Sequence, residues 1–198
     1  MARRGSPDTP AAWAVACALL VLVPWFGLAD DAVDEGDPSG APARLDAWEK
    51  ELDAVYARLL EFVNFEKGQS VDFKFDRVRS LLSALGNPEA ASPCLHVAGS
   101  KGKGSVSTML ARILEASGRK TGLYTSPHLI DFSERISRAG DALGDGFLLS
   151  AWDRLGPLVD GKRADEWPGG MEPTFFELAT VLGFLSFVEA GMDAAVYE

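Results

Sequence analysis

Residues 94–105 read CLHVAGSKGKGS, a short apolar run followed by a loop with three glycines and two lysines. The apolar run at 94–98 predicts a β-strand, and apolar residues at helical spacing over 105–117 predict a helix that Gly118 ends. Glycines between a strand and a helix let backbone N–H groups approach phosphate oxygens. The unpaired N–H groups at the start of the helix favour the same anions. The stretch therefore predicts a nucleotide-phosphate loop.

Individual residues of this loop have expected roles. Lys103 supplies a mobile cation for the terminal phosphates, and Ser105 starts the helix, where its hydroxyl reaches a phosphate or a magnesium ion. The common pattern G-x-x-x-x-G-K-[ST] is not matched, because Val97 replaces its first glycine and Gly104 separates Lys103 from Ser105. The alternative is a flexible glycine-rich turn that binds nothing. The predicted phosphate-binding residues are Gly99, Ser100, Lys101, Gly102, Lys103, Gly104 and Ser105.

The segments around the loop continue the alternation of strand and helix. Downstream, the sequence predicts a strand at 120–125, a long irregular stretch, an apolar helix at 174–190 and a last strand at 194–197. Upstream, packing helices are predicted to start at Leu45 and at Asp76. This order is typical of an α/β fold, here an open, mostly parallel sheet with flanking helices.

Composition and charge restrict the classes of function. The chain is 47% hydrophobic and 24% charged, as in an ordinary globular domain. Its formal net charge of -10 argues against broad contact with nucleic acid, which needs clustered Lys and Arg. The two cysteines lie far apart and match no metal-site spacing or disulfide framework, so a cytoplasmic location is expected.

Residues 1–43 are predicted to be an apolar leader and a disordered linker, and residues 44–198 an incomplete ATP-binding domain. Residues 11–29 carry no charge and follow two arginines, so they resemble a membrane anchor or the core of a signal peptide. The alternative is an extended start before a cytoplasmic domain. Membrane anchoring or export is thus expected only if residues 11–29 act as such a segment.

Four motifs follow one another along the chain: HVAGSKGKGS at 96–105, LYTSPHL at 123–129, DFSERI at 131–136 and EPTFFE at 172–177. Together they resemble the folylpolyglutamate and dihydrofolate synthases of the Mur ligase superfamily, in which the phosphate loop has the form G-x-x-G-K-G-S. The resemblance runs from about residue 60 to Glu198. It implies a Mur ligase-like central domain that is truncated before the enzyme is complete.

The resemblance implies a magnesium site made by Ser126 and Glu198. Hydroxyl and carboxylate oxygens suit this ion, and the carboxyl ends of parallel strands face the crevice where ligands bind. For Ser126 the alternative is a simple turn at Ser126–Pro127. The resemblance also places the segment 174–177 against the pterin of a folate. The same segment has the pattern of a capping box that opens the helix, and both interpretations can hold together. The predicted substrate residues are Thr174, Phe175, Phe176 and Glu177. His128 and the segment 75–77 are weaker candidates.

The implied activity is ATP-dependent ligation of L-glutamate to folate or dihydropteroate by a monomeric enzyme that uses ATP and Mg²⁺. The γ-phosphate passes to a folate carboxylate, and the glutamate amine then attacks the acyl phosphate. Mg²⁺ and Lys103 offset the charge of the transferring group. The family adds a further histidine, a carbamylated lysine and a carboxy-terminal domain, so the chain is expected to be inactive alone. Two alternatives stay open: another Mur-type amide ligase, and a nucleotide-binding module without ligase activity.

Overall fold

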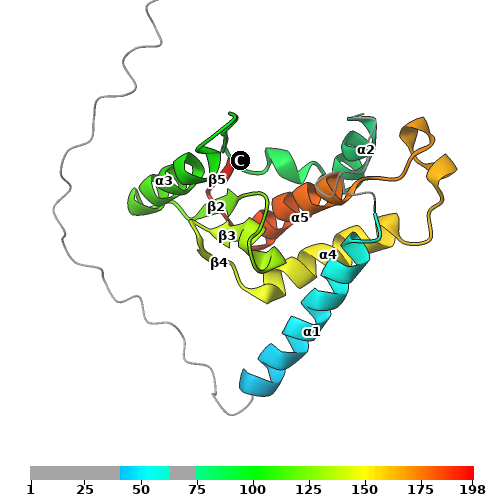
Figure 1. Cartoon of the computed structure of the whole chain (residues 1–198), viewed down its shortest axis with the longest axis horizontal. Coiled ribbons are helices and arrows are strands. Elements are labelled where there is room, and N and C mark those ends of the chain that lie inside the picture. The colour runs from blue at the N-terminus through cyan, green and yellow to red at the C-terminus, as the bar shows by residue number, and fades with distance from the viewer. Residues whose placement is uncertain (1–40, 63–74) are drawn as a thin grey trace, which may run out of the picture. The chain divides into compact units, whose positions relative to one another are not determined.

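A computed structural model describes residues 41–62 and 75–198 (Figure 1). These residues belong to one compact unit, Ser39–Glu198. The predicted leader at 11–29 lies outside the described residues. Within the described ranges, no helix is both long and apolar enough to cross a membrane.

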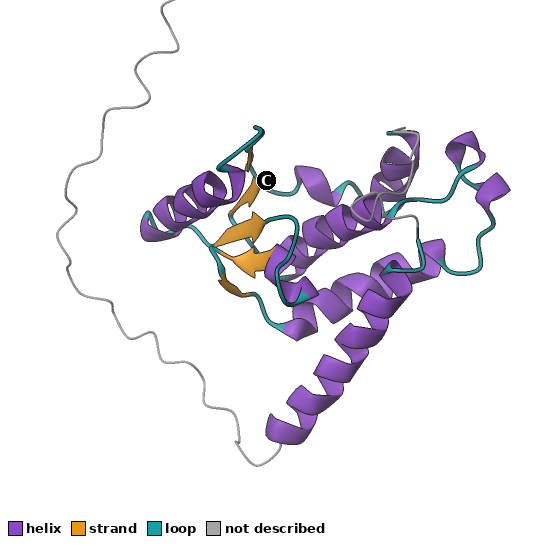
Figure 2. Ribbon diagram, viewed as in Figure 1, coloured by secondary structure: helices purple, strands orange, loops and turns teal. Residues whose placement is uncertain are grey.

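A five-stranded sheet with the order β1-β5-β2-β3-β4 lies at the centre (Figure 2). The first three strands in this order run parallel, and the last two add an antiparallel edge. The strands are β1 (Cys94–His96), β2 (Thr121–Tyr124), β3 (Ile136–Arg138), β4 (Asp141–Ala142) and β5 (Ala194–Tyr197). The α/β class and the three parallel strands are confirmed. The antiparallel edge makes the sheet mixed, and it was not predicted because β3 and β4 are too short to show a pattern.

Helices cover both faces of the sheet. Leu123 and Val196 pack towards α3 (Lys103–Ala116), whereas their neighbours Tyr124 and Ala195 belong to the larger core around α5 (Phe175–Glu189). Successive residues of a strand point to opposite faces, so α3 and α5 lie on opposite sides of the sheet. The larger core also holds α1 (Ala41–Leu59), α2 (Asp76–Ala84) and α4 (Asp145–Val159). The described residues also form four 3₁₀ turns: η3 (Pro88–Ala90), η4 (Phe132–Arg135), η5 (Ala164–Glu166) and η6 (Pro168–Gly170).

The expectation of one long irregular stretch before the last helix is wrong, because α4 lies within it. Gly146, Gly156 and Pro157 make this segment a weak helix former. Its buried residues nevertheless recur at helical spacing and pack between α1 and α5. They are Leu148, Ala151, Leu155, Gly156 and Val159. Burial of this face outweighs the low propensity of the segment.

Two glycines let α5 approach the sheet closely. A Cβ atom on Gly122 of β2 would lie 2.7 Å from the Phe187 ring, and one on Gly183 of α5 would lie 2.8 Å from the Tyr124 ring. Side chains at either position would push the helix away from the strands. The contact fixes α5 over β2 and β5, and thereby places the start of α5 near their carboxyl ends.

On the other face, two ion pairs fasten α3 to the β3–β4 hairpin. Arg112 donates to both carboxylate oxygens of Asp141 at 2.9 Å, and Arg138 Nη2 lies 2.6 Å from Glu115 Oε1. Hydrogen bonds and charge from Arg112 hold the pKa of the Asp141 carboxyl below its usual range. A carboxyl group whose pKa is lower in the folded state stabilises the fold above its unfolded pKa, and this stabilisation is lost as the pH falls towards the folded pKa.

The Asp141→Asn variant is therefore expected to be less stable than the wild type near neutral pH. This stability gap, the difference in free energy of unfolding between wild type and variant, should narrow below about pH 4, the ordinary range of an aspartate. Urea unfolding at a series of pH values measures it. Asp153→Asn, on an exposed position of α4, controls for the change in net charge. A gap that stays constant down to about pH 3 would contradict the role of this ion pair.

Candidate functional site

The predicted phosphate loop connects β1 to α3, as expected. The helix starts at Lys103, two residues before the predicted start at Ser105. Gly102 is its N-cap, with a φ of 74°, a left-handed conformation that favours glycine. As a glycine it has no side chain to accept hydrogen bonds from the first N–H groups of α3. Gly99, Ser100, Lys101 and Gly102 are exposed. The loop and the helix start therefore present backbone donors to an anion.

Glu198 lies against this helix start. Its Oε1 atom is 3.6 Å from Lys103 Nζ, and a Cβ atom on Gly104 would lie 3.2 Å from its Oε2. The Glu198 side chain is only 8% exposed, and its backbone N–H donates to the Tyr124 carbonyl at 2.9 Å. Lys103 and Gly104, at the start of α3, thus meet Glu198, which follows β5 and lies far away in the sequence.

Ser126 leaves the sheet at the same edge as Glu198. Tyr124 of β2 pairs in parallel register with Tyr197 of β5, so the residues after each strand emerge together. A hydroxyl and a carboxylate beside the predicted phosphate loop are hard oxygen donors that suit Mg²⁺. Nowhere in the described residues do three or more His, Cys, Asp or Glu side chains gather around a metal position.

The predicted capping box at the start of α5 is confirmed. Thr174 Oγ1 accepts from the Glu177 N–H at 3.2 Å, and Glu177 Oε2 accepts from the Thr174 N–H at 2.7 Å. Arg77 of α2 is fully buried and donates to both oxygens of Glu177, from Nη2 at 3.1 Å and from Nε at 3.3 Å. The Glu177 carboxylate is thus already engaged by two elements. Thr174 and Phe175 are buried, so Phe176 is the residue of this segment that lines a pocket.

That pocket has a volume of about 250 Å³ and reaches Glu198. Phe176, Thr180 and Phe184 of α5 form one wall, and strand residues form the other: His96, Tyr124 and Tyr197. Burial raises the pKa of Tyr197, which stays a neutral phenol. Apart from Phe176 and Glu198, the lining residues were missed from the sequence. Two periodicities could have found them, every fourth residue on a helix and every second residue on a strand.

The segment from Ser126 to Arg135 forms an ordered turn at the edge of the site. Glu134 accepts from the N–H groups of Leu129, Ile130 and Asp131 at 2.7, 2.9 and 2.9 Å, and these bonds lower the pKa of its carboxyl. His128 Nδ1 accepts from Arg135 Nε at 2.8 Å, so the neutral ring carries its proton on Nε2, 3.2 Å from the Tyr56 hydroxyl. The alternative of a solvated loop histidine is wrong, because His128 is partly buried and bonded through both ring nitrogens. It is a packed bridge between two elements.

No family model matches the chain. Among curated proteins, it is 38% identical over 122 residues to the folylpolyglutamate synthase of Lacticaseibacillus casei, which covers 62% of this chain and 28% of the relative. It is 34% identical over 132 residues to the dihydrofolate synthase/folylpolyglutamate synthase of Mycobacterium tuberculosis, covering 65% of this chain and 27% of the relative. The predicted resemblance is confirmed, and the chain spans 27–28% of the length of these two curated relatives.

Solved structures give the same result. The folylpolyglutamate synthase from Thermotoga maritima superposes with a TM-score of 0.64 at 31% identity, covering 78% of this chain and 33% of that one. The Mycobacterium tuberculosis folylpolyglutamate synthase complexed with ADP gives a TM-score of 0.67 at 30% identity, covering 76% of this chain and 32% of that one. The fold around the predicted phosphate loop is therefore that of these synthases.

Proposed function

We propose that the glycine-rich loop, the start of α3, Ser126 and Glu198 form the magnesium–ATP half of a ligase of the folylpolyglutamate synthase type. The observation that carries the proposal is the Glu198 carboxylate, held 3.6 Å from Lys103 Nζ at the start of α3. Lys103, directly after the glycine-rich loop, supplies a positive charge for the phosphates. Glu198 supplies a negative charge for the magnesium ion. Two solved neighbours support nucleotide binding, since one is a complex with ADP and another is a complex with AMPPCP and folate.

The chain's own groups would divide the work of binding. The N–H groups of the loop and of the first turn of α3 bind the phosphate oxygens, and Lys103 moves from Glu198 to the terminal phosphate. Glu198 and Ser126 would hold Mg²⁺ from two neighbouring strand ends. When bound, the ion offsets negative charge on the γ-phosphate. Ser105, in the first turn of the helix, is exposed, and its hydroxyl would reach a phosphate or the ion.

The acceptor is proposed to be a folate or dihydropteroate whose aromatic part enters the pocket lined by Phe176. Its carboxylate takes the γ-phosphate, and the amine of L-glutamate then attacks the acyl phosphate and expels phosphate. Thr174, Phe175 and Glu177 would contribute by fixing the end of α5. Because the chain spans less than a third of its relatives, we propose that it supplies the phosphate-binding groups and that ligation requires the other groups of such an enzyme.

Glu198→Gln tests the proposal. The variant should bind Mg–ATP at least about tenfold more weakly than the wild type, because the ion loses an anionic ligand. Binding of ATP without magnesium should stay equal or improve, since a negative charge next to the phosphates is removed. Titration calorimetry with and without Mg²⁺ measures both. Glu189→Gln, in an ion pair with Arg154 at the far end of α5, is the matched control. A wild-type chain that binds no nucleotide, or a variant with unchanged magnesium dependence, would refute the proposed site.

A further inference from the structure

The turn that carries Ser126 is anchored on both sides of this residue. On one side, the Thr125 N–H donates to the Arg135 carbonyl at 3.0 Å, which closes the turn against its own far end. On the other side, His128 Nδ1 accepts from Arg135 Nε at 2.8 Å. Two residues, Ser126 and Pro127, lie between these anchors, and a proline ring fixes its own φ at about -65°. The position of the Ser126 hydroxyl therefore depends on where His128 is held.

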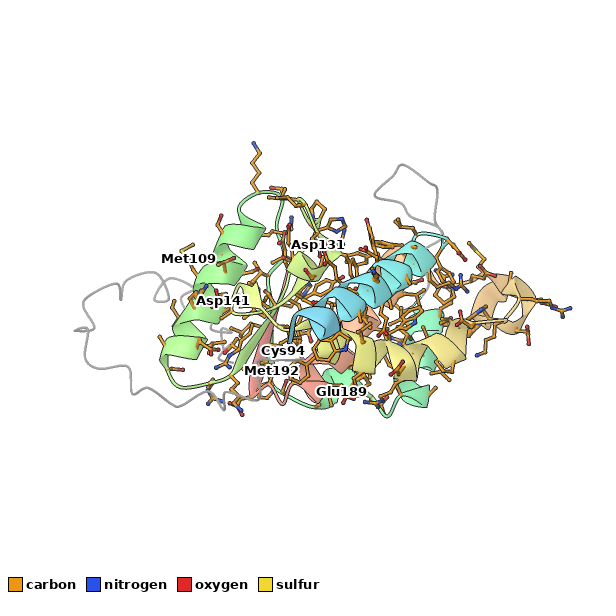
Figure 3. All side chains as sticks on the ribbon, turned by 90° about the horizontal axis from the view of Figure 1, so that it is seen from below. Cys94, Met109, Asp131, Asp141, Glu189 and Met192 are labelled. Carbon is orange, nitrogen blue, oxygen red and sulfur yellow. The ribbon has the colours of Figure 1, made fainter. Side chains whose placement is uncertain are left out.

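The far half of the turn is stiffened from within. Glu134 accepts from the N–H groups of residues 129–131, and the Asp131 carboxylate accepts from the Ser133 N–H at 2.8 Å. Asp131, labelled in Figure 3, marks this part of the turn. A segment whose polar groups are bonded to one another is rigid, so a contact made at His128 places the whole turn.

Tyr56 of α1 contacts this turn from 72 residues earlier in the chain. Its hydroxyl accepts from His128 Nε2 at 3.2 Å, the nitrogen that carries the ring proton because Arg135 donates to Nδ1. The Tyr56 ring stacks on Phe132 of η4, with centroids 5.2 Å apart and planes at 22°. It also meets Phe175, the first residue of α5, edge-on at 6.3 Å. The two rings hold the Tyr56 side chain in place, so its hydroxyl is a fixed point for His128.

Packing alone does not explain why this position is a tyrosine. Tyr56 is half-buried and packs against the larger core, where a phenylalanine would fill the same space. A hydroxyl that is withdrawn from water costs free energy unless it is hydrogen-bonded. The bond to His128 compensates for this cost, and it gives the hydroxyl a role at the turn that the ring does not have.

We propose that Tyr56 is a positioning residue, which acts through His128 to hold the Ser126 hydroxyl where it can meet the magnesium ion of a bound nucleotide. The inference rests on the proposed function, because the ligand role of Ser126 belongs to it. Mg²⁺ demands near-octahedral geometry, so a hydroxyl that is displaced or mobile contributes less to its binding. The proposal gives α1, which contains none of the proposed site residues, a part in building the metal site.

The Tyr56→Phe variant of the full chain removes the hydroxyl and keeps the ring. Titration calorimetry should show Mg–ATP binding weakened about fivefold, the factor expected for one hydrogen bond, and unchanged binding of ATP without Mg²⁺. Amide hydrogen exchange of residues 129–131, measured without nucleotide, should quicken by a similar factor. Arg58→Met removes another contact of α1, a hydrogen bond to Asp160 at 2.9 Å, and as the matched control should change neither quantity. Thermal unfolding verifies that each variant is folded.

A double-variant cycle distinguishes positioning of Ser126 from a general loosening of the fold. Ser126→Ala should itself weaken Mg–ATP binding, and adding Tyr56→Phe should then cause no further loss, because the hydroxyl that Tyr56 positions is gone. Contributions of residues that do not act on each other would add instead.

Three results would overturn the proposal while Mg–ATP still binds to the wild-type chain. They are additive losses in the cycle, unchanged Mg–ATP affinity of Tyr56→Phe, and unchanged hydrogen exchange of residues 129–131 in that variant. Each of them refutes the positioning role alone. A wild-type chain that binds no Mg–ATP refutes the proposed function, and the positioning role with it.

Discussion

Replacing Lys103 by alanine is expected to cause the largest loss of function of any single change in this chain. Lys103 Nζ lies 3.6 Å from Glu198 Oε1, and its side chain is 34% exposed, so the ammonium group is placed beside the loop and still free to move. Without it, the Glu198 carboxylate would face the phosphates uncompensated. We expect Mg–ATP binding by the chain to weaken at least tenfold and turnover in a complete ligase to fall on the order of 100-fold, as when one charge-stabilising donor is removed.

Titration calorimetry gives the affinity, and a folate-dependent glutamate incorporation assay on a complete enzyme gives the turnover. Lys120→Ala is the matched control, because Lys120 is an exposed lysine that precedes β2 at the opposite end of the strand. The unfolding temperature should be unchanged in both variants. Near-normal turnover of Lys103→Ala at saturating ATP would mean that the glycine-rich loop does not bind the terminal phosphates.

The strand, the glycine-rich loop and the helix of the predicted phosphate site could be predicted from the sequence because their pattern is local. Glycines, a lysine and the start of a helix follow one another within a few residues, and each contributes backbone or charge directly. Glu198 required one further step, the parallel pairing of β5 next to β1, which is confirmed. Its contact with Gly104 and Lys103 then follows from the sheet. The magnesium role of Ser126 and Glu198 stays a prediction that the geometry favours.

Other features depend on contacts between distant segments. Arg77 and Glu177 are 100 residues apart, and no spacing rule connects a helix residue with the capping box of another helix. α4 was not predicted because its glycines and proline lower the helix propensity of the segment. Its buried residues do recur at helical spacing, but only their packing in the folded protein stabilises the helix. On α3, helical spacing showed that an apolar stripe exists, but periodicity carries no information about what covers it. Val106 and Ile113 prove to be largely exposed.

The buried ion pair between Arg77 and Glu177 gives the largest expected effect on stability. Arg77→Met should lower the free energy of unfolding by about 3 kcal/mol, because it leaves a largely buried carboxylate without its cation. The Arg77 side chain is 0% exposed and that of Glu177 is 15% exposed. Urea unfolding measures the loss. Arg79→Met, two residues along α2 and 76% exposed, should change stability by less than about 0.5 kcal/mol. A loss of similar size in both variants would show that the buried pair contributes nothing specific.

The double variant Arg77→Met/Glu177→Gln separates the two interpretations of Glu177. Removing the second charge relieves the uncompensated carboxylate, and the glutamine oxygen can still accept from the Thr174 N–H, so part of the lost stability should return. If Glu177 only fixes the end of α5, binding of a folate acceptor to a complete enzyme should return together with stability. If Glu177 contacts the pterin, stability should return while acceptor affinity stays low. Because Arg77 already donates to both Glu177 oxygens, we expect the first outcome, with Phe176 as the residue that meets the ligand.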